Sequence, residues 1–292
     1  MIERGWMSSR PLRKSLAIKC AIDRLPTSSA YKELLMLALL AQVIQGASNI
    51  RFGPELYCGT RRRDAGVYRG FEARVLEMAS DLLAVTALNT GGVQVFQGDS
   101  RECYRLLRPS TRKQFSAGIC SPPYPTEHDY TRNSRLELAF LGLVSDRASL
   151  RSIKENMIRS HTKNIYSEDN DAALVNRITS IKSIVQKLQR KTRKVDHGFG
   201  KLYPTVVGEY FGGMRRHFAS MAKLLKPKGM CAYVVGDQSS YLRVHIPTAK
   251  ILASLAEKAG FRVVEITHWR TRWSSSTSRE VDENILVLQK KV

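Results

Sequence analysis

The segment Ala117–Pro125 joins a short apolar run to the tetrapeptide Ser121-Pro122-Pro123-Tyr124. Two consecutive prolines fix φ and lack an N–H group, so the chain leaves the apolar run as a rigid loop with free carbonyl oxygens. The Ser121 and Pro122 oxygens can accept hydrogen bonds from an exocyclic amine, while the Tyr124 ring stacks on the same planar group. The loop therefore predicts a site for a planar substrate that bears an amine. An ordinary proline-rich turn is the alternative.

The elements expected around this loop alternate between strands and helices. Helical patterns predict helices over 210–225 and 247–259, and Gly260 ends the second one. Short apolar runs predict strands at 93–96, 117–120, 230–235, 261–268 and 285–289. This alternation is typical of an α/β protein with a mostly parallel sheet. Because ligands of such sheets bind beyond the carboxyl ends of the strands, the loop lies where a site is expected.

Several segments in order resemble the amino-group DNA methyltransferases, which transfer a methyl group from S-adenosylmethionine to cytosine N4 or adenine N6. The loop Ser121–Tyr124 resembles their catalytic motif IV, and Val95–Ser100 resembles their motif III. The elements that follow motif IV in the family are matched by Met221–Gly229, Tyr233–Asp237, Glu257–Phe261 and Asp282–Leu288. Each segment is weakly specific alone, but their order and spacing agree through most of residues 90–292.

The resemblance implies a Rossmann-like methyltransferase sheet and a role for particular residues. It implies that the catalytic residues are Ser121, Pro122, Pro123 and Tyr124. It also implies that S-adenosylmethionine is contacted by Gly98, Asp99, Gly236 and Asp237. Both aspartates could instead cap turns. A serine at the first loop position favours cytosine N4 over adenine N6. The implied function is site-specific DNA methylation, within a restriction-modification system.

One part of the family's pattern is missing from the 292 residues: the Phe-x-Gly-x-Gly loop that receives the methionine part of the cofactor. The segment Tyr57–Gly66 has glycines, but no apolar strand precedes it. In the family, the strand with that loop lies beside the strand that ends at motif IV. We therefore expect an incomplete sheet with an unpaired edge at 117–120. The chain is then a split subunit whose partner polypeptide supplies the loop, a truncated remnant, or a self-sufficient enzyme with an unrecognised substitute.

The charge balance indicates a polyanionic partner, and double-stranded DNA is the simplest one. The chain has 47 Lys and Arg against 26 Asp and Glu, a net charge of +21. Residues 151–201 alone have 12 basic and 5 acidic side chains. They belong to a polar, largely helical insertion, at about 126–207, in a catalytic domain of residues 90–292.

We expect this insertion and a helical N-terminal block, residues 1–89, to hold DNA phosphates. The DNA-binding candidates are Lys187, Arg190, Lys191, Arg193, Lys194, Arg270 and Arg272. The last two lie between Trp269 and Trp273, where packing of the tryptophans at a strand exit is the alternative. Within the N-terminal block, residues 1–15 read as a mobile arm, and helices are predicted at 31–45 and 71–88.

Other classes of protein are disfavoured. The five cysteines have no zinc or redox spacing, so we expect reduced, buried thiols, and the six histidines show no metal-ligand spacing. The longest apolar run, 34–44, is too short to span a bilayer, and no export signal is recognised, so a cytoplasmic protein is expected. Two alternatives to the DNA methyltransferase stay open: a non-catalytic or split DNA-binding subunit, and a methyltransferase acting on RNA or a protein amide.

Overall fold

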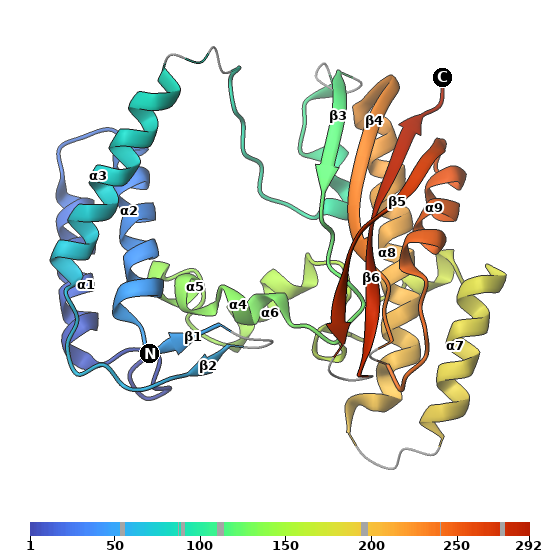
Figure 1. The fold of residues 1–292 in the computed structure, drawn as a ribbon, viewed down its shortest axis with the longest axis horizontal. Helices are drawn as coiled ribbons and strands as arrows, with labels where there is room; N and C mark the ends of the chain where they lie inside the picture. Colours follow the sequence, from blue (N-terminus) through green and yellow to red (C-terminus); the bar gives the residue numbers. More distant parts are fainter. Residues whose placement is uncertain are drawn as a thin grey trace. The chain divides into compact units, whose positions relative to one another are not determined.

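The computed structural model describes residues 1–52, 56–86, 88, 91–109, 114–193, 198–239, 241–274 and 278–292. These residues form two compact units (Figure 1). The first unit contains residues 1–94 and 131–150, and the second contains residues 95–130 and 151–292. Each unit has its own cluster of buried apolar side chains.

The first unit is mainly helical. Its helices are α1 (Ser9–Arg24), α2 (Ser29–Gln42), α3 (Val67–Thr86) and α5 (Arg135–Leu141), and a π-helical turn, Val43–Ala47, extends α2. The strands β1 (Ile50–Arg51) and β2 (Tyr57–Cys58) form a short antiparallel pair. The predicted helices 31–45 and 71–88 are therefore confirmed, with α3 beginning a few residues earlier. The short α4 (Tyr130–Asn133) and α6 (Arg147–Glu155) begin near the borders between the two units.

The expectation of a mobile arm at residues 1–15 is wrong, because α1 begins at Ser9. Arg10 and Arg13 are on the exposed side of this helix. The opposite side is buried at spacings of three and four residues, at Pro11, Ser15, Ile18 and Ile22. The buried face was missed in the sequence because charged residues of the segment lie between its few apolar positions.

The second unit contains a four-stranded sheet in the order β3-β4-β6-β5. Its strands are β3 (Phe115–Cys120), β4 (Leu225–Gly236), β5 (Phe261–Ser274) and β6 (Arg279–Lys290). The α/β class is confirmed, and the sheet is mostly parallel in strand direction, with one reversed strand. Strands β3, β4 and β5 point in the same direction, whereas β6 lies between β4 and β5 and is antiparallel to both. The reason is the short connection between β5 and β6, since a tight link joins only antiparallel strands.

Helices cover one face of this sheet. The helices α7 (Thr179–Thr192), α8 (Tyr203–Leu224) and α9 (Thr248–Lys258) contribute to a common core with the strands, and α9 contacts β4, β5 and β6 (Figure 1). The predicted helices at 210–225 and 247–259 are thus confirmed, although α8 begins earlier, with Pro204 in its first turn. Side chains of α7 from the expected insertion, Ile181, Ile184 and Leu188, belong to this core.

The strand predicted at 93–96 does not form. Val93 and Val95 are 86% and 92% exposed, and no strand pairing includes them. A strand needs a neighbour for its backbone hydrogen bonds, and the sheet described here offers none to this segment. The other four predicted strands form, and those at 261–268 and 285–289 are parts of longer ones. Among the described helices, none combines the length and apolar character needed to cross a membrane.

Candidate active site

The Ser121–Tyr124 loop follows the carboxyl end of β3, as predicted, and hydrogen bonds fix its backbone. The Tyr124 N–H donates to Tyr130 Oη at 3.0 Å, and the Tyr124 carbonyl accepts from Thr126 N–H at 2.8 Å. The Tyr130 ring meets the His128 ring edge-on, with 4.7 Å between the centroids. Partial burial raises the pKa of the Tyr124 phenol, partly offset by its hydrogen bond with Ser121. The ring is therefore a neutral, preorganised stacking surface.

A strained turn follows Tyr124. Glu127 has a positive φ of 64°, a conformation that costs a non-glycine residue about 1 kcal/mol. Its N–H donates to Tyr241 Oη at 3.0 Å and to the Ser160 carbonyl at 3.2 Å, and its carboxylate accepts hydrogen bonds from Thr162. Contacts from two distant segments thus hold the turn in the conformation that leads away from the loop.

Parallel pairing of β3 and β4 brings two of the sequence-predicted residues together. Cys120 lies opposite Tyr233, so both strands end at the same edge of the sheet. There Gly236 packs against the Tyr124 ring: a Cβ atom at Gly236 would lie 3.0 Å from Tyr124 Cε2. Glycine at 236 therefore permits the close approach of β4 to the aromatic ring.

A buried carboxylate, which the sequence did not reveal, organises the two arginines predicted on β5. Register places Gly236, Glu283 and Arg270 in one row across β4, β6 and β5. Glu283 is 4% exposed; its Oε2 accepts from Arg270 Nε at 2.6 Å, and its Oε1 lies 3.4 Å from Arg272 Nε. The Arg272 guanidinium carbon is 5.8 Å from the centroid of the Tyr124 ring. The row therefore joins Tyr124, Gly236, Arg270 and Arg272 in one cluster.

The tryptophans beside these arginines are not packed in the core. Trp269 and Trp273 are 50% and 66% exposed, and the Arg270 guanidinium carbon lies 4.4 Å from the centroid of a Trp269 ring. The alternative of a strand exit that buries its tryptophans does not describe this segment.

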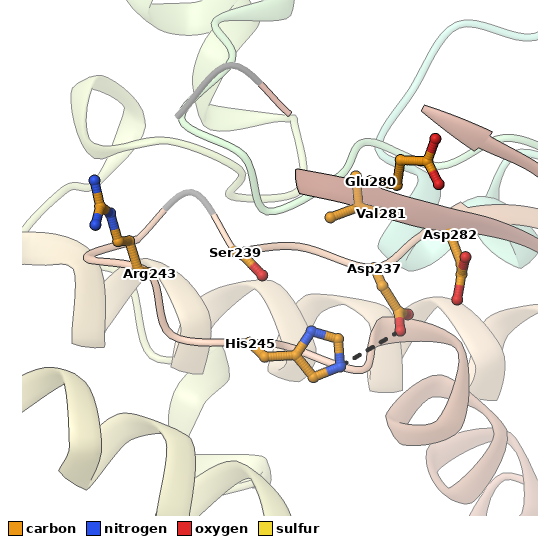
Figure 2. Close-up of a pocket in the computed structure, with 7 residues that line it drawn as sticks. All are labelled: Asp237, Ser239, Arg243, His245, Glu280, Val281 and Asp282. Atoms are coloured by element: carbon orange, nitrogen blue, oxygen red, sulfur yellow. Dashed lines mark ion pairs between the residues drawn. The ribbon is translucent and has the colours of Figure 1, made fainter. Parts of the chain in front are cut away.

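A pocket of about 490 Å³ opens where β4 ends (Figure 2). It is lined by Asp237, Ser239, Arg243, His245, Glu280, Val281 and Asp282. Figure 2 shows Asp237 and His245 pointing toward one another, and their Oδ2 and Nε2 atoms are 3.7 Å apart. Burial raises the pKa of the Asp237 carboxyl, and His245 partly offsets this effect. Three carboxyl groups in one pocket of a strongly basic protein suit a ligand rich in hydrogen-bond donors.

A groove of about 680 Å³ with basic side chains on its walls shares Arg243 and His245 with this pocket. Its other wall is α7, which contributes the sequence-predicted Lys187, Arg190 and Lys191. Lys191 Nζ donates to the Leu242 carbonyl at 2.8 Å. Of the remaining predicted cations here, Arg193 caps α7, and Lys194 lies outside the described residues.

The loop that carries Arg243 is strained. Leu242 and Arg243 have consecutive positive φ values, 52° and 58°. Such conformations persist where the surroundings impose them, and they occur often at binding sites. The strained pair places Arg243 on the walls of both the pocket and the groove.

Asp99, the expected cofactor residue, is engaged within the protein. Its carboxylate accepts from the Arg101 N–H at 2.8 Å and from Arg101 Nε, and Arg101 also pairs with Asp171 at 2.9 Å. The preceding Gly98 is close to Leu106: a Cβ there would lie 2.5 Å from Leu106 Cδ2. The structure therefore brings Gly236 to the catalytic loop and places Asp99 at a turn, in an ion pair.

Tyr210 is a second residue that the sequence did not single out. It is fully buried on α8, and within the described residues its Oη has no hydrogen-bond partner. Burial raises its pKa well above the usual value, and the neighbouring Tyr130 and Tyr124 add to the effect. Its position in an apolar helical pattern gave no signal of proximity to the loop.

The expectation that the cysteine thiols are buried is met by some of them and not by others. Cys231 is buried, and burial raises its pKa to about 11, but Cys20 and Cys58 are exposed. All five cysteines are unpaired. No cluster of three metal-binding side chains occurs among the residues that the structure describes.

Comparisons with known proteins agree with the motifs. The chain is 26% identical over 196 residues to the type II methyltransferase M.AvaI of Nostoc sp. (strain PCC 7120), a match covering 65% of this chain and 39% of that protein. It is 24% identical over 194 residues to the type II methyltransferase M.BsoBI of Geobacillus stearothermophilus, covering 61% and 37%. The matches therefore span about two fifths of the length of these relatives. No family model matches the chain.

Among solved structures, TTHA0409 of Thermus thermophilus, a candidate DNA modification methylase, is similar over 67% of this chain and 51% of its own, with 16% identity and a TM-score of 0.33. The chain is thus similar in sequence to proteins named as type II methyltransferases.

Proposed function

We propose that the protein is a DNA methyltransferase of the amino-group type, with S-adenosylmethionine as the methyl donor and cytosine N4 as the preferred target over adenine N6. The observation that carries the proposal is the packing of Tyr124 on Gly236, beside the Glu283-linked arginines. The loop with Tyr124 lies at the same end of the sheet as Arg270. The pocket lined by Asp237 and Asp282, whose carboxylates can accept hydrogen bonds, opens at this end as well. The relatives named as type II methyltransferases support the same class.

The chain's own residues account for binding and orientation of the base. An amine inside a duplex is reached by flipping the base out of the stack, which costs roughly a few kcal/mol. Tyr124 stacks on the flipped base, while the Ser121 and Pro122 carbonyls accept the amine hydrogens and orient its nitrogen. Catalysis is then mainly positioning, and no cysteine nucleophile is needed. Lys187, Arg190 and Arg270 hold phosphates.

S-adenosylmethionine would supply the methyl group, but the described residues do not make a complete site for it. Arg101 engages both oxygens of Asp99, and the chain has no Phe-x-Gly-x-Gly loop. Gly98, Asp99, Gly236 and Asp237 remain predicted contacts, of which the last two lie beside the catalytic loop. Base binding is therefore the part of the function that we assign to this chain's own residues.

The test is nucleoside analysis of DNA from a bacterial host that has no N4 or N6 DNA methylation of its own. Expression of the active enzyme should produce N4-methyldeoxycytidine, detected by mass spectrometry after complete digestion. N6-methyldeoxyadenosine instead would replace the proposed base, and methylation confined to RNA or protein would replace the proposed substrate. The Tyr124→Ala variant, expressed at the same level, is the control for background.

A split enzyme is the second candidate, and the edge of β3 favours it. In the sheet described here β3 pairs only with β4, so its other edge has no strand partner. Ile119 of β3 is 87% exposed, which is unusual for an apolar side chain in a sheet. A partner polypeptide with a parallel strand and the Gly-rich loop would cover this edge. We place either form in a restriction-modification system in the cytoplasm.

A further inference from the structure

We infer that Arg272 reads the acceptor edge of the target base and selects cytosine over adenine, while the neighbouring Arg270 contacts phosphate. This inference rests on the proposed function and deepens it, because it assigns the choice of base to one side chain. Both arginines extend from the same face of β5, two residues apart, and both face Glu283.

The two arginine side chains differ in their exposure to solvent, and this difference indicates different roles. The Arg270 side chain is 58% exposed and stacks on the exposed Trp269, as suits a contact with the solvated DNA backbone. The Arg272 side chain is 33% exposed, and its Nε and Nη2 atoms are buried. A partly buried guanidinium beside the Tyr124 ring suits a contact with the flipped base better than a contact with the solvated DNA backbone.

The buried donors of Arg272 also lack acceptors within the described protein. Nη2 has no hydrogen-bond partner among these residues, and Nε makes only the 3.4 Å ion-pair contact with Glu283. Leaving a buried charged donor without an acceptor is costly, so the side chain is prepared for a ligand with acceptor atoms. Glu283, at 4% exposure, pairs with the guanidinium and helps to fix its position.

The chemistry of the two bases then decides between them. The guanidinium lies 5.8 Å from the Tyr124 ring, so a base held by this ring is within its reach. Cytosine has two adjacent acceptors, N3 and O2, next to its amine, and arginine presents paired donors. Adenine has one acceptor, N1, followed by a C–H group. Two N–H groups of Arg272 can therefore donate hydrogen bonds to N3 and O2 of cytosine. Against adenine, only one of them has an acceptor.

The test compares Arg272→Gln with Arg270→Gln, which lies on the same strand and loses the same carboxylate partner. The probes are oligo(dC), oligo(dA) and an oligonucleotide of abasic sites, titrated by fluorescence anisotropy at several salt concentrations. We expect the unaltered protein to prefer oligo(dC), and Arg272→Gln to lose about tenfold of that preference without a change in salt slope. Arg270→Gln should keep the preference while its salt slope falls by about 0.9.

An unchanged preference for oligo(dC) in Arg272→Gln, or no such preference in the unaltered protein, overturns the inference. Arg272→Lys, which keeps the charge but not the paired donors, should behave like Arg272→Gln, and a thermal unfolding scan confirms that each variant is folded. Failure of the proposed function looks different: methylated nucleosides are absent from host DNA even when the chain is expressed with a polypeptide that carries the Gly-rich strand, whatever the oligonucleotide preferences are.

Discussion

At the scale of single residues, the Tyr124 ring is the side chain on which base binding depends most. Its backbone is fixed by Tyr130 and Thr126, and its ring rests on Gly236, so it is positioned before any ligand binds. Preorganisation of this kind lowers the cost of ordering the site when the base enters. The first two predictions concern this residue and the buried hydroxyl of Tyr210.

Tyr124→Ala should lower methyl transfer roughly tenfold or more, because stacking of a base on an aromatic side chain contributes about 1–3 kcal/mol. Salt-sensitive binding to duplex DNA should change little, since the substitution removes no cation and leaves Lys187 and Arg190 of α7 in place. Tritiated-methyl incorporation by the complete enzyme and a gel-shift titration measure the two effects. Tyr124→Phe is the control and should keep most of the activity. Normal incorporation by Tyr124→Ala would remove this ring from the site.

Tyr210→Phe should raise the free energy of unfolding by about 1 kcal/mol, since it removes a buried hydroxyl that lacks a hydrogen-bond partner in the described structure. Tyr233→Phe is the matched control: its Oη lies 3.0 Å from Nε2 of the buried His217, so its loss should lower stability by a similar amount. Urea unfolding of both variants measures the difference. Equal destabilisation would mean that the Tyr210 hydroxyl is bonded in solution.

At the scale of secondary-structure elements, α7 illustrates how one helix contributes to both the core and the binding surface. Ile181, Ile184 and Leu188 pack inward, whereas Lys187 and Arg190 line the groove that leads toward the pocket. A helix anchored in this way presents its charges in a fixed arrangement. Its cations are therefore expected to follow the DNA backbone.

Reversal of Lys187 and Arg190 to glutamate should weaken binding to all duplexes. Each phosphate contact that is lost lowers the slope of log K against log salt by about 0.9, so two lost contacts lower it by about 1.8. Lys250→Glu with Lys258→Glu on α9 makes the same change in net charge at exposed positions of another helix. A slope that falls equally in both double variants would show a general charge effect instead of contacts along α7.

Local sequence patterns predicted the helices and most strands, because their periods of about 3.6 and 2 residues depend only on which side chains are buried. The β3–β4 pair could be inferred from the motif order, and it brought Tyr124 to Gly236. The role of Glu283 could not be inferred, since it depends on the register of three strands. The strand at 93–96 was wrong because strand formation requires a neighbour, which local hydrophobicity does not report.

At the scale of the whole molecule, the described helices α8 and α9 pack on one face of the sheet, and β3 is its edge strand. Register places Ile119, Ala232 and Val287 in one row on the face opposite the α8 and α9 core. A Rossmann-like sheet that binds a cofactor at a strand end normally has neighbours on both sides of that strand. Because β3 has a strand partner on one side only in the described sheet, we expect cofactor binding to need a second polypeptide that pairs with its open edge.

The purified chain alone should therefore bind S-adenosylmethionine poorly, be inactive, and be prone to association through the open edge of β3. A polypeptide with the Gly-rich strand should restore both cofactor binding and transfer, because its strand would satisfy the backbone hydrogen-bonding groups at the open edge of β3. Isothermal titration with and without that polypeptide measures the first effect, and analytical ultracentrifugation measures association. Ile119→Lys places a charge on the exposed face of the edge strand β3, outside the catalytic loop; it should reduce self-association and weaken complementation together. Micromolar cofactor binding by the monomeric chain would show that the first 90 residues provide the missing part of the site, and the split-enzyme candidate would then be abandoned.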